Sequence, residues 1–384
     1  MDESGGGGER QAMLDVVVVG AGPAGLATSY ELKRHGIGHA VLERGSEVGT
    51  TWATLYDSLV LHTGRHMSQL PGMRIPRSVP LFPPREAFLR YLRDYARRFE
   101  LPVRTGVDVS GAGRRGRHWV LATSGGEVEA KVLVMATGIV SCPIVPAFEG
   151  RDVYRGTLLH SAEYHRPTDA PGKNVLVVGV GNSGGEIASE LAASGRAVDV
   201  AVRSGANVVP LTLAGIPIQY LSNIVLKFPR PVQDAITGAV RQIDEWRRGP
   251  SPLPPGNGRP LDVIPLIGFH LVDAINAGKV RVRPGVARLT EDGAVFSDGT
   301  AGAYDAIVLA TGFAAALAPL GGLVRRDAKG LALRDGRVAS ADHPDLFFVG
   351  QNYDARGAVY NIAQDAGLAA EAIARHLAQP EGRN

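Results

Sequence analysis

The sequence predicts a protein of the α/β class, in which helices cover parallel sheets. Two valine-rich strands, at 16–19 and 174–178, each run straight into a glycine-rich turn and a helix-forming stretch. A continuous apolar run suits a strand that is buried on both faces, as in the middle of a parallel sheet. In addition, two other strands both end in Ala-Thr-Gly. These repeats predict two Rossmann-like dinucleotide-binding domains, the second inserted into the first.

The first glycine-rich turn reads GAGPAG and spaces Gly20, Gly22 and Gly25 as G-x-G-x-x-G. Gly20 permits a tight turn, Gly22 lets the backbone approach a pyrophosphate, and Gly25 allows a helix to pack closely on the strand. The helix expected after this turn starts with free N–H groups and the positive end of its dipole. We therefore expect Pro23 and Ala24 to lie at the phosphates of a bound dinucleotide.

The next apolar strand, HAVLE, ends at Glu43. A carboxylate at this place accepts a hydrogen bond from a ribose hydroxyl and repels a 2′-phosphate. The first domain is therefore expected to bind FAD, whose adenosine ribose carries no such phosphate. The following loop, 47–63, is expected at the edge of the cofactor, where Trp52 either fills the core or contacts the ligand.

Between the two glycine-rich turns we expect irregular chain, one helix and a small sheet. Five prolines between 71 and 84 enforce extended backbone. Residues 85–99 repeat apolar side chains with helical spacing. Residues 103–109 and 118–123 are typical of strands in a small antiparallel layer, and 132–135 of a buried strand.

The second glycine-rich turn, GVGNSG, places Gly179, Gly181 and Gly184 in the same spacing. No acid ends the strand that follows; Arg203 stands there instead, beside Ser204. An arginine binds a 2′-phosphate bidentately, whereas a carboxylate repels it. This pattern favours NADPH over NADH at the second domain, with a solvated surface arginine as the alternative.

A proline-rich stretch, 209–265, interrupts the second domain. Its apolar segments fit a packed helical insertion, which is the interpretation we adopt. A substrate lid, a membrane-surface patch and a dimer contact are the alternatives.

The remaining chain is expected to complete both domains. A short helix at 270–279 precedes strands that return to the second sheet at 280–282, 294–297 and 307–309. A strand at 346–350 and a long helix at 358–377 then rejoin the first domain. A helix that begins there points its positive end at a flavin ring.

The predicted domain bounds follow from this order of elements. Residues 13–166 and 310–384 are assigned to the FAD domain, 167–309 to the NADPH domain, and 209–265 to its insertion. Residues 1–12 are polar and glycine-rich and are expected to form a disordered tail.

Composition narrows the function classes. A net charge of +3, with arginines scattered along the chain, gives no support for nucleic-acid binding. The single cysteine, Cys142, excludes an internal disulfide and a redox-active cysteine pair. Because we see no signal peptide and no apolar run of about 18 residues, we expect a soluble cytoplasmic protein without an integral membrane segment. No metal site is expected.

Two further motifs indicate a family. The segment YRGTLLHSAEY, from Tyr154 to Tyr164, resembles the F-x-G-x-x-x-H-x-x-x-[Y/F] signature of class B flavoprotein monooxygenases, with Tyr154 in place of the first Phe. The sequence GTTW before residue 53 resembles the G-G-x-W motif of the same class, with Thr50 in place of the second Gly. The resemblance extends over nearly the whole chain and is strongest to the YUCCA-like indole-3-pyruvate monooxygenases.

The resemblance implies an enzyme that uses FAD, NADPH and O2 as co-substrate. Such an enzyme inserts one oxygen atom into a small organic substrate through a flavin C4a (hydro)peroxide. The substrate is expected to be a 2-oxo acid or another carbonyl compound. Tyr164 stands where Baeyer–Villiger enzymes carry Trp, which disfavours lactone formation, and 58–63 lacks the Asn of N- and S-oxygenating members. The alternatives are N- or S-oxygenation, a non-oxygenating FAD/NADPH oxidoreductase, and a flavoprotein sensor.

The resemblance also implies site residues. The further FAD contacts are Arg44, Thr51, Trp52, His62, Val107, Ala136, Thr137, Gly138, Gly350 and Gln351. The further NADP contacts are Asn182, Ser183, Ala310, Thr311 and Gly312, although Asn182 and Ser183 equally fit caps of their own helix. The candidate catalytic residues are His62, Arg65, Asn182 and Arg356, and either arginine suits a substrate carboxylate. His160 is expected to stabilise the interdomain linker and to signal cofactor binding, with a purely structural turn as the alternative. The partner is a small-molecule substrate, and the protein is expected to be a monomer or a homodimer.

Overall fold

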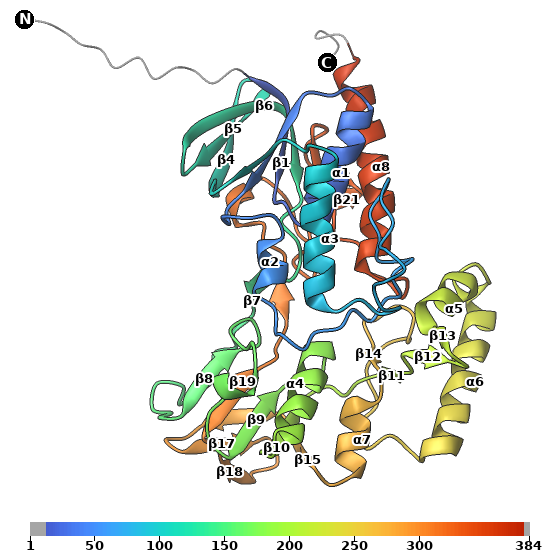
Figure 1. Cartoon of the computed structure of the whole chain (residues 1–384). Coiled ribbons are helices and arrows are strands. Elements are labelled where there is room, and N and C mark those ends of the chain that lie inside the picture. Colours follow the sequence, from blue (N-terminus) through green and yellow to red (C-terminus); the bar gives the residue numbers. More distant parts are fainter. Residues whose placement is uncertain (1–12, 380–384) are drawn as a thin grey trace, which may run out of the picture.

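The computed structural model describes residues 13–379 and contains two main sheets with parallel strands, one above the other in Figure 1. The upper sheet and its helices, called the first unit here, combine the blue, cyan and red parts of the chain. The lower sheet and its helices, the second unit, are green to orange. The predicted α/β class is therefore confirmed, whereas the predicted tail, 1–12, lies outside the described residues.

Five parallel strands form the centre of the first unit, in the order β3, β2, β1, β6 and β23. They are β1 (Leu14–Val19), β2 (His39–Glu43), β3 (Val103–Thr105), β6 (Gly126–Met135) and β23 (Leu346–Phe348). Two antiparallel strands, β21 (Arg334–Asp335) and β22 (Ala339–Ser340), extend the sheet beyond β23. The antiparallel pair of β4 (Val109–Arg115) and β5 (His118–Thr123) joins the sheet at β6. The helices of this unit are α1 (Pro23–Arg34), α2 (Thr50–Ala53), α3 (Arg85–Arg98) and α8 (Ala358–Leu377).

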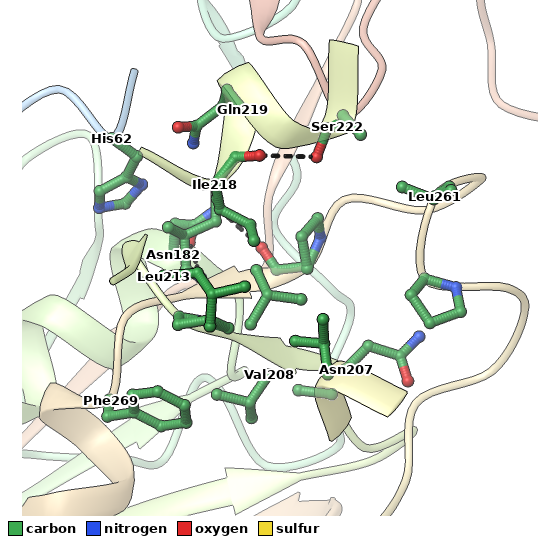
Figure 2. A pocket seen from close by; sticks show the side chains of 18 of the residues that line it. His62, Asn182, Asn207, Val208, Leu213, Ile218, Gln219, Ser222, Leu261 and Phe269 are labelled. Atoms are coloured by element: carbon green, nitrogen blue, oxygen red, sulfur yellow. Dashed lines mark hydrogen bonds between the residues drawn. The ribbon is translucent and has the colours of Figure 1, made fainter. Parts of the chain in front are cut away.

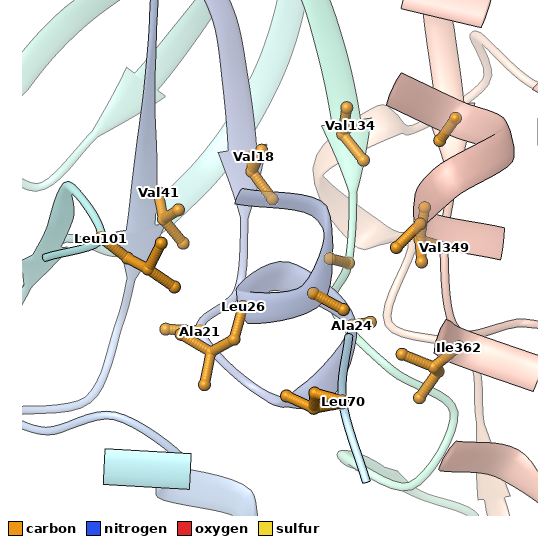
Figure 3. Packing of buried hydrophobic residues seen from close by; sticks show 14 of the residues in the cluster. Val18, Ala21, Ala24, Leu26, Val41, Leu70, Leu101, Val134, Val349 and Ile362 are labelled. Atoms are coloured by element: carbon orange, nitrogen blue, oxygen red, sulfur yellow. The ribbon is translucent and has the colours of Figure 1, made fainter. Parts of the chain in front are cut away.

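The four valines of β1 alternate between the two faces of the first sheet. Val16 and Val18 pack with the residues of α1, α3 and α8, and Figure 3 shows Val18 beside Val41 and Val134 of the neighbouring strands. Val17 and Val19 pack on the other face, in a cluster that contains the buried Trp119. Because both faces are covered, every position of this strand is apolar, and each valine contributes about 1.5–3 kcal/mol by burial.

The second unit repeats this plan with the strand order β15, β10, β9, β19 and β8, all parallel. The strands are β8 (Thr157–His160), β9 (Asn174–Val178), β10 (Ala197–Val202), β15 (Val280–Pro284) and β19 (Ala306–Leu309). Helices α4 (Asn182–Ala193) and α7 (His270–Asn276) pack on one face. An antiparallel layer of β16 (Val286–Leu289), β17 (Gly293–Phe296) and β18 (Ala301–Ala303) contributes to the cluster on the other face.

Strand β8 corrects the predicted domain boundary between 166 and 167. It pairs with β19, with Leu158 beside Ile307, so the chain has already entered the second sheet at Thr157. The strand is only four residues long, and its partner lies about 150 residues further along the chain. Local sequence does not reveal such a pairing, because the partner strand is what defines it.

Two predicted strands also belong to other layers than expected. Val103–Thr105 was expected in an antiparallel layer, but it extends the parallel sheet beside β2. The predicted strand 294–297 was expected in the second sheet, but β17 lies in the separate antiparallel layer with β16 and β18. Strand β3 is three residues long and partly polar, and β17 is four residues long and begins with a glycine. Neither shows the apolar run that is typical of a central strand.

The chain crosses between the units twice, and the two crossings are paired. Strand β7 (Cys142–Pro143) leaves the first unit, β20 (Phe313–Ala314) returns to it, and the two form an antiparallel ribbon. Ile144 N–H donates to the carbonyl of Gly312, and the Thr311 hydroxyl donates to the carbonyl of Ile144. The two connections therefore form one double-stranded link.

The insertion lies at the edge of the second unit, in yellow in Figure 1. It contains β11 (Val208–Val209), β12 (Thr212–Leu213), β13 (Ile216–Pro217), α5 (Ile218–Val225) and α6 (Arg230–Arg248), and β14 (Leu266–Ile267) follows it and pairs with β11. Its helical character agrees with the prediction. The predicted packing of the insertion is wrong for α6, because Gln233 is the only buried residue of this helix and Trp246 is 87% exposed. Among the helices formed by residues 13–379, none combines the length and hydrophobicity that crossing a bilayer requires.

Candidate functional site

The first glycine motif forms a cradle between β1 and α1. Gly20 has a φ of +102°, and a Cβ there would lie 2.7 Å from the carbonyl oxygen of Ala136, at the end of β6. A Cβ on Gly25 would overlap the carbonyl oxygen of Gly20. At Gly22, the N-cap of α1, a Cβ meets no atom within 4 Å. The first and third glycines are thus required by packing, whereas the middle one faces open space, as a pyrophosphate site requires.

Glu43 lies beside this cradle with its carboxylate held in place. It is 6% exposed, and its two oxygens accept hydrogen bonds from the backbone N–H groups of Ala21 (2.7 Å) and Gly45 (2.9 Å). A carboxylate oxygen has two lone pairs, so each retains a place for one further donor. The predicted bond from a ribose hydroxyl is compatible with this geometry and stays a prediction.

The other predicted FAD residues gather around the same edge. Val107 N–H donates to the carbonyl of Glu43, Arg44 is exposed next to it, and the Thr137 hydroxyl donates to the carbonyl of Ala316. Gly350 lies against Ala24, since a Cβ there would be 3.0 Å from it. Gln351 is buried, and its side-chain oxygen accepts a hydrogen bond from Ala332 N–H. Gly138, which follows Thr137, is half-buried.

Trp52 and Thr51 lie in α2, a short helix where a loop was expected. The Trp52 ring packs edge-on against Phe88, with 4.5 Å between ring centroids, and Trp52 also lines a cavity described below. The two interpretations of this tryptophan, core filling and ligand contact, are therefore compatible.

The second glycine motif has the same geometry as the first. Gly179 has a φ of +108°, and a Cβ there would lie 2.5 Å from the carbonyl oxygen of Ala310, which follows β19. A Cβ on Gly184 would overlap the carbonyl oxygen of Gly179, and one on Gly181 meets nothing within 4 Å. Each Ala-Thr-Gly turn thus supports the first glycine of one motif, which explains why the same ending occurs twice.

Arg203 follows the last residue of β10 and is exposed, as is Ser204. Within residues 13–379, the guanidinium of Arg203 has no hydrogen-bond or ion-pair partner. It is therefore available to a phosphate, and its predicted role at a 2′-phosphate stays a prediction.

Asn182 opens α4 but does not cap it. The N-cap is Gly181, and no side chain bonds to the free N–H groups there. Instead, the Asn182 amide donates to the carbonyl of Pro265, and its oxygen accepts a hydrogen bond from Ile267 N–H. The capping interpretation is therefore wrong for Asn182, whose side chain ties α4 to the end of the insertion.

A cavity of about 810 Å³ lies between the two units, and the insertion closes one side of it (Figure 2). The first unit contributes Trp52, Tyr56, His62 and, where the chain leads into α8, residues 353–355 and 357–359. The second unit contributes Asn182, Ser183 and Glu186 from the first turns of α4. Most of the remaining wall is apolar and comes from the insertion. Its volume and lining are those of a small-molecule site.

Glu186 joins the two units at this cavity. Its carboxylate accepts a 2.6 Å hydrogen bond from the hydroxyl of Tyr56 and also bonds the ring Nε2 of His62. Burial, followed by the charge of Glu186, raises the pKa of the Tyr56 hydroxyl well above its usual value. Tyr56 is therefore a neutral donor at physiological pH. His62 lies on the cavity wall, and its hydrogen-bond partner Glu186 comes from α4 of the other unit. Its predicted contact with FAD stays a prediction.

Neither of the two candidate arginines reaches the cavity wall. The guanidinium of Arg65 donates to the carbonyl of Val79, and Arg65 is not among the lining residues. Arg356 forms an ion pair with Asp354 at 2.5 Å and also bonds Asn361. The hydrogen bonds of its guanidinium to Asp354 raise the pKa of Arg356. The expected role of either arginine in holding a substrate carboxylate is not supported, because the guanidinium groups already bind protein oxygens.

His160 binds the return crossing. Its Nε2 lies 3.2 Å from the carbonyl oxygen of Gly312, and its ring packs edge-on against Phe313, with 5.0 Å between centroids. Burial lowers its pKa, so the ring is neutral at physiological pH. The linker role expected for His160 agrees with these contacts.

Sequence reasoning missed Glu186 and Glu190, which lie one turn apart on α4. Glu190 accepts a 2.6 Å hydrogen bond from the hydroxyl of Tyr164 in the same way that Glu186 binds Tyr56. Like charges four residues apart destabilise an isolated helix, so this spacing signals that partners exist elsewhere in the fold.

Comparisons with known proteins agree with this geometry. A family model described as pyridine nucleotide-disulphide oxidoreductase matches residues 17–243. The indole-3-pyruvate monooxygenase YUCCA1 of Oryza sativa subsp. japonica is 34% identical over 313 residues, which cover 77% of this chain and 76% of the relative. The YUCCA6 enzyme of Arabidopsis thaliana is 33% identical over 317 residues, with 77% and 75% covered. The chain belongs to the flavin monooxygenase family.

Solved structures show that the fold is shared with flavin monooxygenases. The flavin-containing monooxygenase from Stenotrophomonas maltophilia aligns with a TM-score of 0.77 at 24% identity, covering 96% of this chain and 100% of that one. The NADP+-bound cyclohexanone monooxygenase from Rhodococcus sp. Phi1 aligns with a TM-score of 0.71 at 20% identity, covering 95% and 85%. As a flavin monooxygenase, the protein is an oxidoreductase that uses FAD, NADPH and O2. The disulphide chemistry named in the family description needs a cysteine pair, and this sequence has one cysteine.

Proposed function

We propose that the first unit holds FAD, the second holds NADPH, and the enzyme inserts oxygen into a small, largely apolar carbonyl compound bound in the cavity between them. One observation carries this proposal: the first turns of α4, the residues that lead into α8, and the apolar insertion all line the same 810 Å³ cavity. The residues expected to face FAD, NADPH and the substrate therefore all line this one cavity.

The two glycine cradles assign the cofactors to the two units. Gly20, Gly22 and Gly25 hold the pyrophosphate of FAD at the start of α1, and Glu43 holds its ribose. Gly179, Gly181 and Gly184 do the same for NADPH at the start of α4, and Arg203 binds its 2′-phosphate. The two units are then Rossmann-like domains, the second inserted into the first.

When bound, the flavin supplies the redox chemistry, taking a hydride from NADPH and activating O2. The protein positions the reacting groups, stabilises charge that develops on them, and keeps water away from them. Ala358 and Val359, in the first turn of α8, line the cavity, so the positive end of this helix dipole would stabilise negative charge on a flavin bound beside it. The apolar insertion keeps water away from the reaction, which protects the activated oxygen from decay before it reaches the substrate.

The names of the relatives favour a carbonyl substrate. The indole-3-pyruvate and cyclohexanone named in them both carry a carbonyl group. The apolar wall suits a substrate with a hydrophobic body, and most of its polar groups already have partners within the protein.

The decisive test is isotope incorporation. Purified enzyme is incubated with NADPH and ¹⁸O2 and with carbonyl compounds, amines and sulfides in turn. We expect one ¹⁸O atom in the product of a carbonyl compound, formed in proportion to the NADPH consumed. Consumption of NADPH without labelled product from any carbonyl compound contradicts the proposal, and a labelled amine or sulfide product favours the N- or S-oxygenating alternative.

A further inference from the structure

Helix α6 has two rows of apolar side chains, and only one of them lines the cavity. Ile236 and Val240, four residues apart, lie on the cavity side. A second row repeats at intervals of three or four residues, the spacing that places side chains on one face of a helix. Its members are Val232, Ala235, Ala239, Ile243 and Trp246. None of them lines the cavity, and we call this row the outer face of α6.

The outer face is exposed to solvent. Val232 is 40% exposed, Ile243 48% and Trp246 87%, and the two alanines between them are exposed as well. Phe228, two residues before the helix begins, is 47% exposed. Figure 1 shows α6 at the edge of the molecule. Because large apolar side chains gain free energy when they leave water, a row of this length indicates a surface that covers it.

Basic side chains without ion-pair partners lie next to the outer face. Lys227 and Arg230 are close to Phe228 at the start of α6, and all three are exposed. Arg247 follows Trp246 at the other end and is exposed too. No salt bridge joins Lys227, Arg230 or Arg247 to any residue between 13 and 379. Their charges are therefore available to a binding partner.

The acids of α6 do not offset this charge. Asp234 forms an ion pair with Arg259 at 2.7 Å, and Glu245 forms one with Arg241 at 2.8 Å. Asp244 lies on the cavity side of the helix. Residues 209–265 contain six basic and four acidic side chains, so the insertion carries +2 of the net charge of +3 of the whole chain. The exposed surface of α6 thus complements an anionic surface.

We propose that the outer face of α6 docks on the surface of an anionic phospholipid membrane, where Val232, Ile243 and Trp246 enter the boundary between headgroups and acyl chains. The three unpaired basic side chains then bind lipid phosphates. A helix that lies in the plane of this boundary needs no segment that spans the bilayer. Tryptophan suits the boundary, because its ring is apolar and its indole N–H donates to a polar group.

The charges favour a membrane over a second copy of this chain. A twofold contact uses the same surface on both copies, so it would bring Arg247 and the other unpaired basic side chains together on both sides. Like charges repel, whereas lipid phosphates attract them. Docking does not depend on the substrate or the reaction proposed above.

The test uses the holoenzyme and two kinds of extruded vesicle, equal parts of phosphatidylcholine and phosphatidylglycerol, and phosphatidylcholine alone. We expect the wild type to sediment with the mixed vesicles and to bind the uncharged ones at least about tenfold more weakly, since each basic residue near an anionic surface contributes about fivefold. Arg230→Gln combined with Arg247→Gln should weaken binding to the mixed vesicles about tenfold or more. Arg288→Gln, at an exposed arginine of the second unit, is the matched control and should bind like the wild type.

Trp246 also reports on docking directly. The chain has three tryptophans; Trp119 is fully buried and Trp52 packs against Phe88, so Trp246 is the exposed one. Its fluorescence should shift to shorter wavelength on mixed vesicles and be quenched by brominated lipid. Trp246→Gln should bind these vesicles at least about tenfold more weakly and keep its FAD content and its rate of NADPH oxidation. Leu368→Gln, at a 42% exposed position of α8, should bind like the wild type.

Each alternative gives a different result. A wild type that does not sediment with mixed vesicles overturns the proposal, and so does equal binding of wild type and Trp246→Gln. Equal affinity for both kinds of vesicle overturns the part given to the basic side chains. Analytical ultracentrifugation without vesicles tests the second copy: a wild-type dimer that Trp246→Gln converts to a monomer assigns the outer face to a dimer contact instead.

Discussion

The hydroxyl of Tyr56 donates a 2.6 Å hydrogen bond to the carboxylate of Glu186, and this bond joins residues 130 positions apart on opposite sides of the cavity. His62 binds the other oxygen of the same carboxylate. Close by, the backbone N–H of Asp57 donates to the carbonyl of His165. One helix of the second unit is thus bound by two side chains of the first unit at the point where both cofactors are expected to meet.

Replacing Tyr56 with Phe should weaken this connection without opening a cavity. Loss of a hydrogen bond to a charged group is expected to lower the free energy of unfolding by about 1.5–3 kcal/mol. Urea unfolding at pH 7 measures the change. Tyr360→Phe is the control, because no hydrogen bond of the Tyr360 hydroxyl is found within residues 13–379. Equal stability of the two variants would show that the Tyr56–Glu186 bond contributes nothing net.

The glycine motifs predict a separation between folding and cofactor binding. Gly22→Ala and Gly181→Ala should fold, because a Cβ at either position meets no atom within 4 Å. The added methyl group occupies the space where backbone approaches a pyrophosphate, so Gly22→Ala should lose FAD and Gly181→Ala should raise the KM for NADPH about tenfold or more. The flavin absorbance and steady-state kinetics measure these effects. Gly25→Ala should fail to fold, since its Cβ overlaps the carbonyl oxygen of Gly20. Full FAD content in Gly22→Ala would contradict the assignment.

Arg203 should decide between the two nicotinamide cofactors. Its exposed guanidinium at the end of β10 is free to bind a 2′-phosphate, which NADH lacks. Arg203→Ala should raise the KM for NADPH by about tenfold and leave the KM for NADH nearly unchanged. A parallel rise for both cofactors would instead indicate a general effect on the domain. Arg288→Ala, at another exposed arginine of the second unit, is the control.

Asp199 predicts how stability depends on pH. This carboxylate is 1% exposed, and it accepts hydrogen bonds from Arg283, Tyr304 and Arg281. Burial acts to raise its pKa, but these bonds outweigh burial and hold the pKa below its usual 3.8. Because the folded-state pKa is depressed, the stabilisation is fully present above about pH 4 and is lost as the pH falls through the lowered value.

Asp199→Asn should therefore be destabilising by about 1.5–3 kcal/mol at pH 7, since the bonds of the buried carboxylate to two partly exposed arginines lose their charge. Unfolding in urea from pH 7 down to pH 3 measures the difference between wild type and variant. That difference should shrink below about pH 4, where the Asp199 carboxyl takes up a proton in the unfolded chain before it does so in the folded one. A difference that stays constant over this range would show that Asp199 is not the group that titrates.

Features that depend on local backbone were predictable from the sequence. Gly20 and Gly179 both adopt positive φ values that other residues rarely reach, so their place in the motif already specified the turn. The helix expected at 358–377 agrees with α8 to the residue, because its apolar side chains repeat with helical spacing and Gly357 precedes it.

Features that depend on a distant partner were not predictable. The pairing of β8 with β19 and the contact of Glu186 with Tyr56 join segments more than 120 residues apart. Arg356 is a different case: its partner Asp354 is only two residues away, but the sequence does not show whether the guanidinium binds this neighbour or a ligand.

Strands β7 and β20 carry the two connections between the units and are hydrogen-bonded to each other. A change in the orientation of one unit relative to the other must therefore twist this single short ribbon. Cys142 lies on that ribbon, is exposed, and is the sole thiol of the sequence. A fluorophore or spin label attached there reports on the paired strands β7 and β20, without the need to remove other cysteines first.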